Sequence, residues 1–112
     1  MRFAIPLADG RLCNHFGHCQ QFALIDVDEN NTIMPDVKLI DPPPHEPGLL
    51  PRWLHEQGAN VIIAGGMGHR ARQLFDQNGI DVVVGAPVEA PETLVQLHLD
   101  GALTCGENAC DH

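Results

Sequence analysis

Residues 61–75 read Val-Ile-Ile-Ala-Gly-Gly-Met-Gly-His-Arg-Ala-Arg-Gln-Leu-Phe, and this stretch decides the fold. Its apolar start predicts a buried strand, and Ala71, Leu74 and Phe75 have the spacing of one face of an amphipathic helix. The turn Gly65-Gly66-Met67-Gly68 lies between them and leaves backbone N–H groups open at the helix start. Because this end is the positive pole of the helix dipole, an anion is favoured there. The alternative is an ordinary turn in which glycine serves only close packing.

The side chains around this turn add to its binding capacity. His69 is a candidate metal ligand, and Arg70 and Arg72 place two cations in the first helical turn. Met67 offers a thioether for a soft, sulfide-rich guest, although a methionine here can also simply fill a gap in the core. The turn lacks the lysine and Ser/Thr of a nucleotide-binding loop.

Composition restricts the class of protein. A chain of 112 residues with 44% hydrophobic content can form one domain with a real core. Six basic and fifteen acidic residues give a net charge of −9, which argues against nucleic acid or a membrane surface as a partner. The apolar run at the N-terminus is too short for a signal peptide, so we expect a cytoplasmic protein with metal-bound or reactive thiols.

The flanking sequence supplies the other elements of an α/β domain. We expect strands at residues 2–8, 21–28, 32–40 and 80–84, and helices at residues 49–57 and from Pro91 to about His98 or Asp100. Pro6 cannot donate to a central ladder, so the first strand should end or bulge there. The branched residues of 80–84 suit burial on both faces. The proline-rich residues 41–48 predict an extended linker or lid.

This pattern predicts a three-layer α/β domain over residues 1–101, with about five strands in a mixed sheet. Residues 102–112 carry no apolar periodicity, and we expect a flexible tail that contains Cys and His. Ligands of such sheets collect outside the carboxyl ends of the parallel strands. The segment 11–19 and the glycine turn should therefore meet at one edge.

Two groups of thiols and imidazoles are candidate metal ligands. Cysteine and histidine are the ligands that zinc, copper and iron–sulfur units select. The first group is Cys13, His15, His18 and Cys19, and the second, in the tail, is Cys105, Cys110 and His112. In the alternative interpretation the first group is divided between core and surface, and the tail thiols are incidental.

The sequence does not favour an enzyme. No recognisable pair of carboxylates suits acid–base work or two hard metal ions. A Cys/His nucleophile would need an orienting group and an oxyanion pocket, and the sequence does not show that such groups converge.

Four segments in order resemble one known family. They are His15-Phe16-Gly17-His18, Gln21 to Asp26, Pro47 to Leu54, and Val61 to Gly68. Together they resemble the dinitrogenase iron–molybdenum cofactor biosynthesis family over residues 2–101. The resemblance implies a ribonuclease H-like domain without nuclease activity. It also implies a carrier of iron–molybdenum cofactor precursors or of other molybdenum- or iron-containing sulfide clusters. Such a role would resemble that of carrier proteins in nitrogen fixation.

The same resemblance assigns the binding region to His15 and the glycine turn, and we add their neighbours Phe16, Gly17 and Arg70 to the predicted site. The cargo would be an anionic cluster of molybdenum or iron, with copper as a further candidate. Its partners would be cluster-donating and cluster-accepting proteins. A zinc- or redox-responsive Cys/His interaction module, binding zinc in place of a cluster, is the alternative function.

Overall fold

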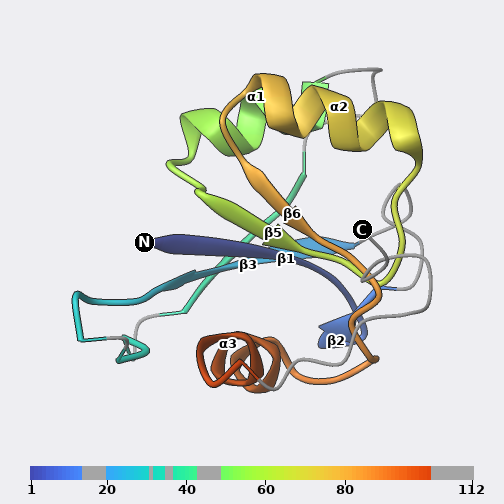
Figure 1. Cartoon of the computed structure of the whole chain (residues 1–112). Coiled ribbons are helices and arrows are strands. Elements are labelled where there is room, and N and C mark those ends of the chain that lie inside the picture. Colours follow the sequence, from blue (N-terminus) through green and yellow to red (C-terminus); the bar gives the residue numbers. More distant parts are fainter. Residues whose placement is uncertain (14–19, 31, 35–36, 43–48, 102–112) are drawn as a thin grey trace.

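The computed structural model describes residues 1–13, 20–30, 32–34, 37–42 and 49–101. The strands are β1 (Arg2–Ala8), β2 (Arg11–Leu12), β3 (Gln21–Asp26), β4 (Lys38–Ile40), β5 (Val61–Ile63) and β6 (Asp81–Val83). The helices are α1 (Leu49–Glu56), α2 (His69–Gln77) and α3 (Pro91–Leu99). In Figure 1 one sheet lies between α1 and α2 on one side and α3 on the other.

The sheet is mixed, as the sequence predicts. Its strand order is β4-β3-β1-β5-β6, and β2 pairs with β1 outside this path. The β1–β5 and β5–β6 pairs are parallel, whereas β3 lies antiparallel to both β1 and β4. The carboxyl ends of β1, β5 and β6 therefore meet at one edge, which we call the carboxyl edge. The opposite edge, where β1 begins and β3 ends, is the amino edge.

Alternating side chains of β1 build a separate core on each face. Phe3 and Ile5 belong to the cluster that includes Leu94 and Val95 of α3. Ala4 belongs to the other cluster, with residues of α1 and α2. This period of two is the physical cause of the three layers, because successive residues of a strand point to opposite faces. The three-layer prediction is confirmed, and the ribonuclease H-like label stays a prediction.

The expected end of the first strand at Pro6 is wrong, because β1 continues through Pro6 to Ala8. Pro6 pairs in register with Phe22 of β3, and its carbonyl accepts a hydrogen bond from the Cys13 N–H on the other side. In an extended residue the N–H and C=O point the same way, so the missing donor faces away from β3. The central β1–β3 ladder consequently loses no hydrogen bond.

Two other strand predictions also need correction. Residues 80–84 do not form a strand that is buried on both faces. Their strand, β6, is the last strand in the sheet order, and in it Asp81 is exposed whereas Val82 and Val83 are half-buried. A branched run has the same sequence pattern at an edge as at the centre. Of residues 32–40, the described pairing is limited to β4 and an isolated bridge from Ile33 to Val27. The short strand β2 was not predicted, and it raises the expected five strands to six.

The predicted helix ends are close to the observed ones. Gly58 and Gly79, which follow α1 and α2, have φ angles of +84° and +73°. Glycine adopts these left-handed conformations without strain, and a residue in this conformation cannot continue a right-handed helix. Each helix therefore ends before its glycine. Pro91 is the first residue of α3, as expected.

Candidate binding site at the carboxyl edge

The end of β1 fixes both ends of the segment that carries the first predicted metal group. The N–H of Cys13 donates to the Pro6 carbonyl at 2.9 Å, and the N–H of Gln20 donates to the Leu7 carbonyl at 2.7 Å. Acceptors on neighbouring residues of β1 thus hold the two flanks of segment 14–19. His15, Phe16, Gly17, His18 and Cys19 lie outside the described residues, so their assignments stay predictions.

Cys13 is the described member of that group. Cys13 is only 7% exposed, so it is buried just before segment 14–19. Within the described ranges, no three His, Cys, Asp or Glu side chains lie close enough to share a metal ion. Metal ligation by Cys13 therefore stays a prediction that depends on partners outside these ranges.

The tail group also stays a prediction. Cys105, Cys110 and His112 lie beyond Gly101, the last described residue. The division of the chain into a domain at 1–101 and a tail at 102–112 is likewise untested.

The end of β5 leads directly into the glycine turn. Ala64 is buried, Gly65, Gly66 and Met67 are half-buried, and Gly68 is exposed. Gly68 has φ −65° and ψ 154°, an extended conformation that any residue can adopt. A Cβ built at Gly68 would meet no heavy atom of the described structure within 4 Å. Space is therefore open at this position, and glycine is not required there by its dihedral angles.

The start of α2 has open backbone donors. Gly68 is its N-cap and has no side chain that could accept a hydrogen bond. The first hydrogen bond of the helix runs from the Arg72 N–H to the Gly68 carbonyl at 3.1 Å. The N–H groups of His69, Arg70 and Ala71 precede it and have no acceptor within the helix. Together with the helix dipole they form a positive, donor-rich site, as the sequence predicts.

The side chains of this helix start point in more than one direction. His69 and Arg70 are exposed, and the His69 Nε2 atom lies 3.1 Å from the Gln73 side-chain nitrogen. His69 and Arg72 line a groove between α2 and β6. His69 is therefore partly directed toward the side of the sheet, and the assignment of His69 and Arg70 to the cluster site stays a prediction.

Met67 packs against the core. It is partly buried and packs against the hydrophobic cluster between the sheet and the helices α1 and α2. This observation favours the interpretation of Met67 as a filler of the core, with part of its surface still accessible.

Sequence reasoning missed a third segment of the carboxyl edge, residues 84–90. The Gly85 N–H donates to the Gly65 carbonyl at 3.0 Å, and the Leu12 N–H donates to the Glu89 carbonyl at 3.0 Å. This segment therefore connects the end of β6 with the glycine turn and with β2. The signal was present in Gly85-Ala86-Pro87, a turn sequence directly after a strand, where Gly85 has φ +81°.

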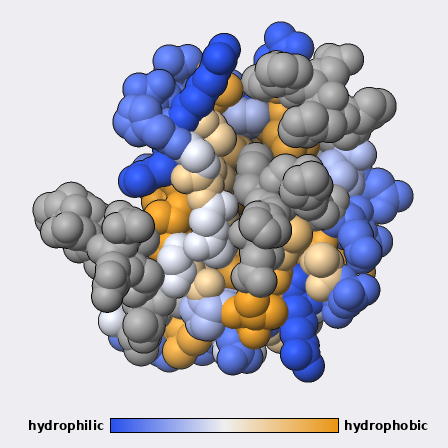
Figure 2. Space-filling model, turned by 90° about the vertical axis from the view of Figure 1, so that its right-hand side faces the viewer, coloured by the Kyte–Doolittle hydropathy of each residue, from blue (hydrophilic) through white to orange (hydrophobic). Residues whose placement is uncertain are grey.

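Figure 2 shows the molecule from the side on which β1, β5 and β6 end. Pale and orange surface runs through the middle of the described part of this face, and blue, hydrophilic surface lies mainly at its upper left and along its right. The middle of the described surface is thus less polar than its margins, which suits a soft guest held by backbone donors.

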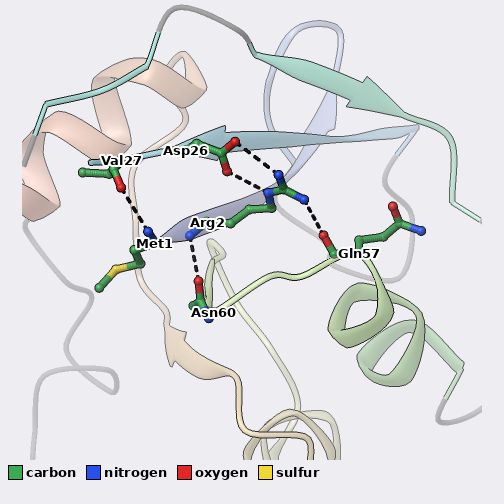
Figure 3. Close-up of polar contacts among 6 residues, drawn as sticks. All are labelled: Met1, Arg2, Asp26, Val27, Gln57 and Asn60. Carbon is green, nitrogen blue, oxygen red and sulfur yellow. Dashed lines mark hydrogen bonds and ion pairs between the residues drawn. The ribbon is translucent and has the colours of Figure 1, made fainter. Parts of the chain in front are cut away.

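The amino edge has a different construction (Figure 3). Arg2 donates from Nε to Asp26 Oδ1 at 2.7 Å, from Nη2 to Asp26 Oδ2 at 3.2 Å, and from Nη1 to the Gln57 carbonyl at 2.6 Å. The hydrogen bond from Arg2, assisted by its charge, lowers the pKa of Asp26, and the same bond raises the pKa of Arg2. The Asn60 side chain accepts from the Arg2 N–H at 2.8 Å. These groups join β1, β3 and the α1–β5 connection.

No helix within the described ranges has the length and apolar character needed to cross a membrane.

The family follows from comparison with known proteins. The family model described as dinitrogenase iron–molybdenum cofactor matches residues 1–101. The chain therefore belongs to the dinitrogenase iron–molybdenum cofactor family, which confirms the resemblance seen in its motifs.

Individual relatives agree with this assignment. An uncharacterized protein of Methanocaldococcus jannaschii is 32% identical in an alignment of 108 positions that covers 92% of this chain and 89% of the relative. The crystal structure of PH0822 is similar with a TM-score of 0.85 at 27% identity and covers 100% of both chains. The apo form of the orange protein from Desulfovibrio gigas has a TM-score of 0.71 at 25% identity and covers 95% of this chain and 92% of its own.

Proposed function

We propose that this protein binds a soft, anionic metal–sulfur cluster at the carboxyl edge and passes it to an acceptor protein, without catalysing a reaction. The observation that carries the proposal is the open start of α2, where Gly68 provides no side-chain cap. A thiometalate or iron–sulfur cluster would accept hydrogen bonds from these N–H groups, and the dipole favours its negative charge.

The surroundings support a guest of this chemistry. The site lies at the ends of two adjacent parallel strands, β1 and β5, and segment 84–90 forms hydrogen bonds to the glycine turn and to β2. In the proposal, His15, His18 and Cys19 supply soft ligands from the segment whose flanks β1 holds, and Arg70 adds positive charge. Few direct bonds and many weak donors suit reversible binding, which a carrier needs.

Family membership supports a cargo related to the iron–molybdenum cofactor. The structure of the orange protein is described as its apo form, which supports the idea that a structurally similar protein holds a removable group. Molybdenum and iron are therefore the first metals to test, with copper as a third. In this proposal the protein works in the cytoplasm, receives its cluster from a donor protein and passes it to an acceptor protein.

The test is anaerobic reconstitution of the apo-protein with sulfide and molybdate, iron or copper. A bound cluster is expected to give charge-transfer absorption in the visible range and stoichiometric metal after gel filtration. Replacing His15 and Cys19 together, by Ala and Ser, should weaken uptake far more than replacing His45 and His55 by Ala. Absence of both absorption and bound metal would contradict the proposal.

The same apo-protein, loaded with zinc instead, distinguishes the alternative, a zinc- or redox-responsive module. That function predicts one colourless zinc ion and a melting temperature lowered by a chelator. Truncation after Gly101 separates the two sites, because a carrier should still bind its cluster whereas a tail-based zinc site should lose its ion.

A further inference from the structure

Strand β6 leaves one side of the sheet open in the described structure. It pairs with β5 on one side, and no described strand pairs with the other. The Asp81 N–H donates to the Asn60 carbonyl, and the Val83 carbonyl accepts from the Ala64 N–H. Residues 81 and 83 thus direct their backbone groups toward β5. Because successive residues alternate, the N–H and C=O of Val82 point to the open side.

A groove with a volume of about 400 Å³ runs beside this open strand, between β6 and α2. Its helical wall is made of polar residues one turn apart, and its strand wall is formed by residues at the start of β6. The lining residues are His69, Arg72, Gln73, Asp76, Ile80, Asp81 and Val82. In Figure 1, α2 lies above β6 along this side of the sheet.

Charge is distributed unequally along the helical wall. His69 and Arg72 lie in its N-terminal half, and Asp76 lies in its C-terminal half. Arg72 and Asp76 are exposed, and neither forms an ion pair within the part of the chain that the structure describes. When two copies of α2 approach in antiparallel orientation, the basic half of each meets the acidic half of the other, and their dipoles also oppose favourably.

We propose that a second copy of this chain docks at this surface, with β6 paired to β6 of the partner around a two-fold axis near Val82. In that arrangement the Val82 N–H and C=O bond to their counterparts, and Arg72 faces Asp76 of the partner copy. Such a contact is isologous, because the same surface serves both copies. It also covers an open sheet edge, which is otherwise prone to uncontrolled pairing. The inference does not depend on the cargo.

Sedimentation equilibrium of the full-length apo-protein tests this interface. We expect a reversible monomer–dimer equilibrium. Asp76→Arg should weaken the dimer about tenfold or more, since it replaces two attractive contacts by two repulsive ones. The combined variant Arg72→Asp with Asp76→Arg should restore it, because the charges are only exchanged. The exchange also suits the helix dipole, so the double variant should fold.

Glu92→Arg is the matched control. Glu92 lies on α3, on the other face of the sheet, and its replacement changes the net charge by the same amount as Asp76→Arg. The control should leave the dimer as strong as the wild type or strengthen it, because it reduces the repulsion between chains of net charge −9.

Amide hydrogen exchange gives a second measurement on the wild-type protein. The Val82 amide should exchange more slowly as protein concentration rises through the dimerisation range. A chain that stays monomeric at all concentrations would overturn the proposal. A dimer that is insensitive to Asp76→Arg, or a Val82 amide whose exchange does not depend on concentration, would overturn it equally.

Discussion

The amino and carboxyl edges of the same sheet use their polar groups in opposite ways. At the amino edge, Arg2 is engaged by Asp26, Gln57 and Asn60 (Figure 3). At the carboxyl edge, α2 begins at Gly68 without a side-chain cap. The first edge therefore contributes polar bonds to stability, whereas the second leaves donors for a guest. We therefore predict that stability and the proposed cluster binding can be changed separately, and four stability measurements test how far that separation holds.

The largest expected loss of stability comes from the core contact that anchors α2, the helix that begins at the carboxyl edge. Phe75 is fully buried, and it is the buried residue that α2 contributes to the core of the described structure. Phe75→Ala should lower the free energy of unfolding by about 3–5 kcal/mol, because it removes a large side chain and leaves a cavity. Urea denaturation measures this loss. The half-buried Leu74 is the control, and an equal loss in Leu74→Ala would contradict the assignment of α2 anchoring to Phe75.

The next effect is at the amino edge. Arg2→Met keeps much of the aliphatic side chain but removes its hydrogen bonds to Asp26 and Gln57. We expect the free energy of unfolding to fall by about 1–2 kcal/mol, because the ion pair is partly exposed. Cluster uptake should stay unchanged. Uptake is compared with that of the wild type at the same metal concentration and well below the melting temperature of the variant. Reduced uptake would show that the two edges are coupled.

The ion pair predicts a pH dependence of stability. Arg2 lowers the pKa of Asp26 in the folded state, so the contribution of the pair is complete above the unfolded pKa, about 3.9 for an Asp. It is lost as the pH falls through the lower, folded pKa. The gap in unfolding free energy between wild type and Arg2→Met should therefore narrow below about pH 4. Since Asp26 is 40% exposed, the change should stay below about 1 kcal/mol. A gap that widens in acid would contradict this.

The smallest expected stability effect is a gain at the carboxyl edge. Gly68→Asp fits the extended φ of −65° and the open space at this position. The new carboxylate can cap the first N–H groups of α2 and should stabilise the protein by a few tenths of a kcal/mol. Thermal or urea denaturation of the apo-protein measures the gain. A clear loss of stability would show that the turn depends on glycine for its conformation.

Particular residues show what the sequence could and could not predict. The period of two in β1 and the spacing around Phe75 predicted the layers, because burial imposes those periods directly. The edge position of β6 was not predictable from its branched residues, since pairing partners lie elsewhere in the chain. Segment 84–90 was missed for the same reason: its bonds to Gly65 and Leu12 join residues far apart in sequence. The open start of α2 was predictable because Gly68 directly precedes the helix.

The most direct test of the account compares cluster uptake by Gly68→Asp and Ala90→Asp. Ala90 is the N-cap of α3, with φ −64° and ψ 146° and no side-chain cap, so it matches Gly68 in geometry. Both variants add one negative charge and one cap. If the cluster binds at the start of α2, Gly68→Asp should reduce uptake about tenfold or more in anaerobic reconstitution. Ala90→Asp should reduce uptake much less, because it adds the same charge on segment 84–90 but leaves the N–H groups of α2 uncapped. Undiminished uptake by a folded Gly68→Asp variant would contradict the account.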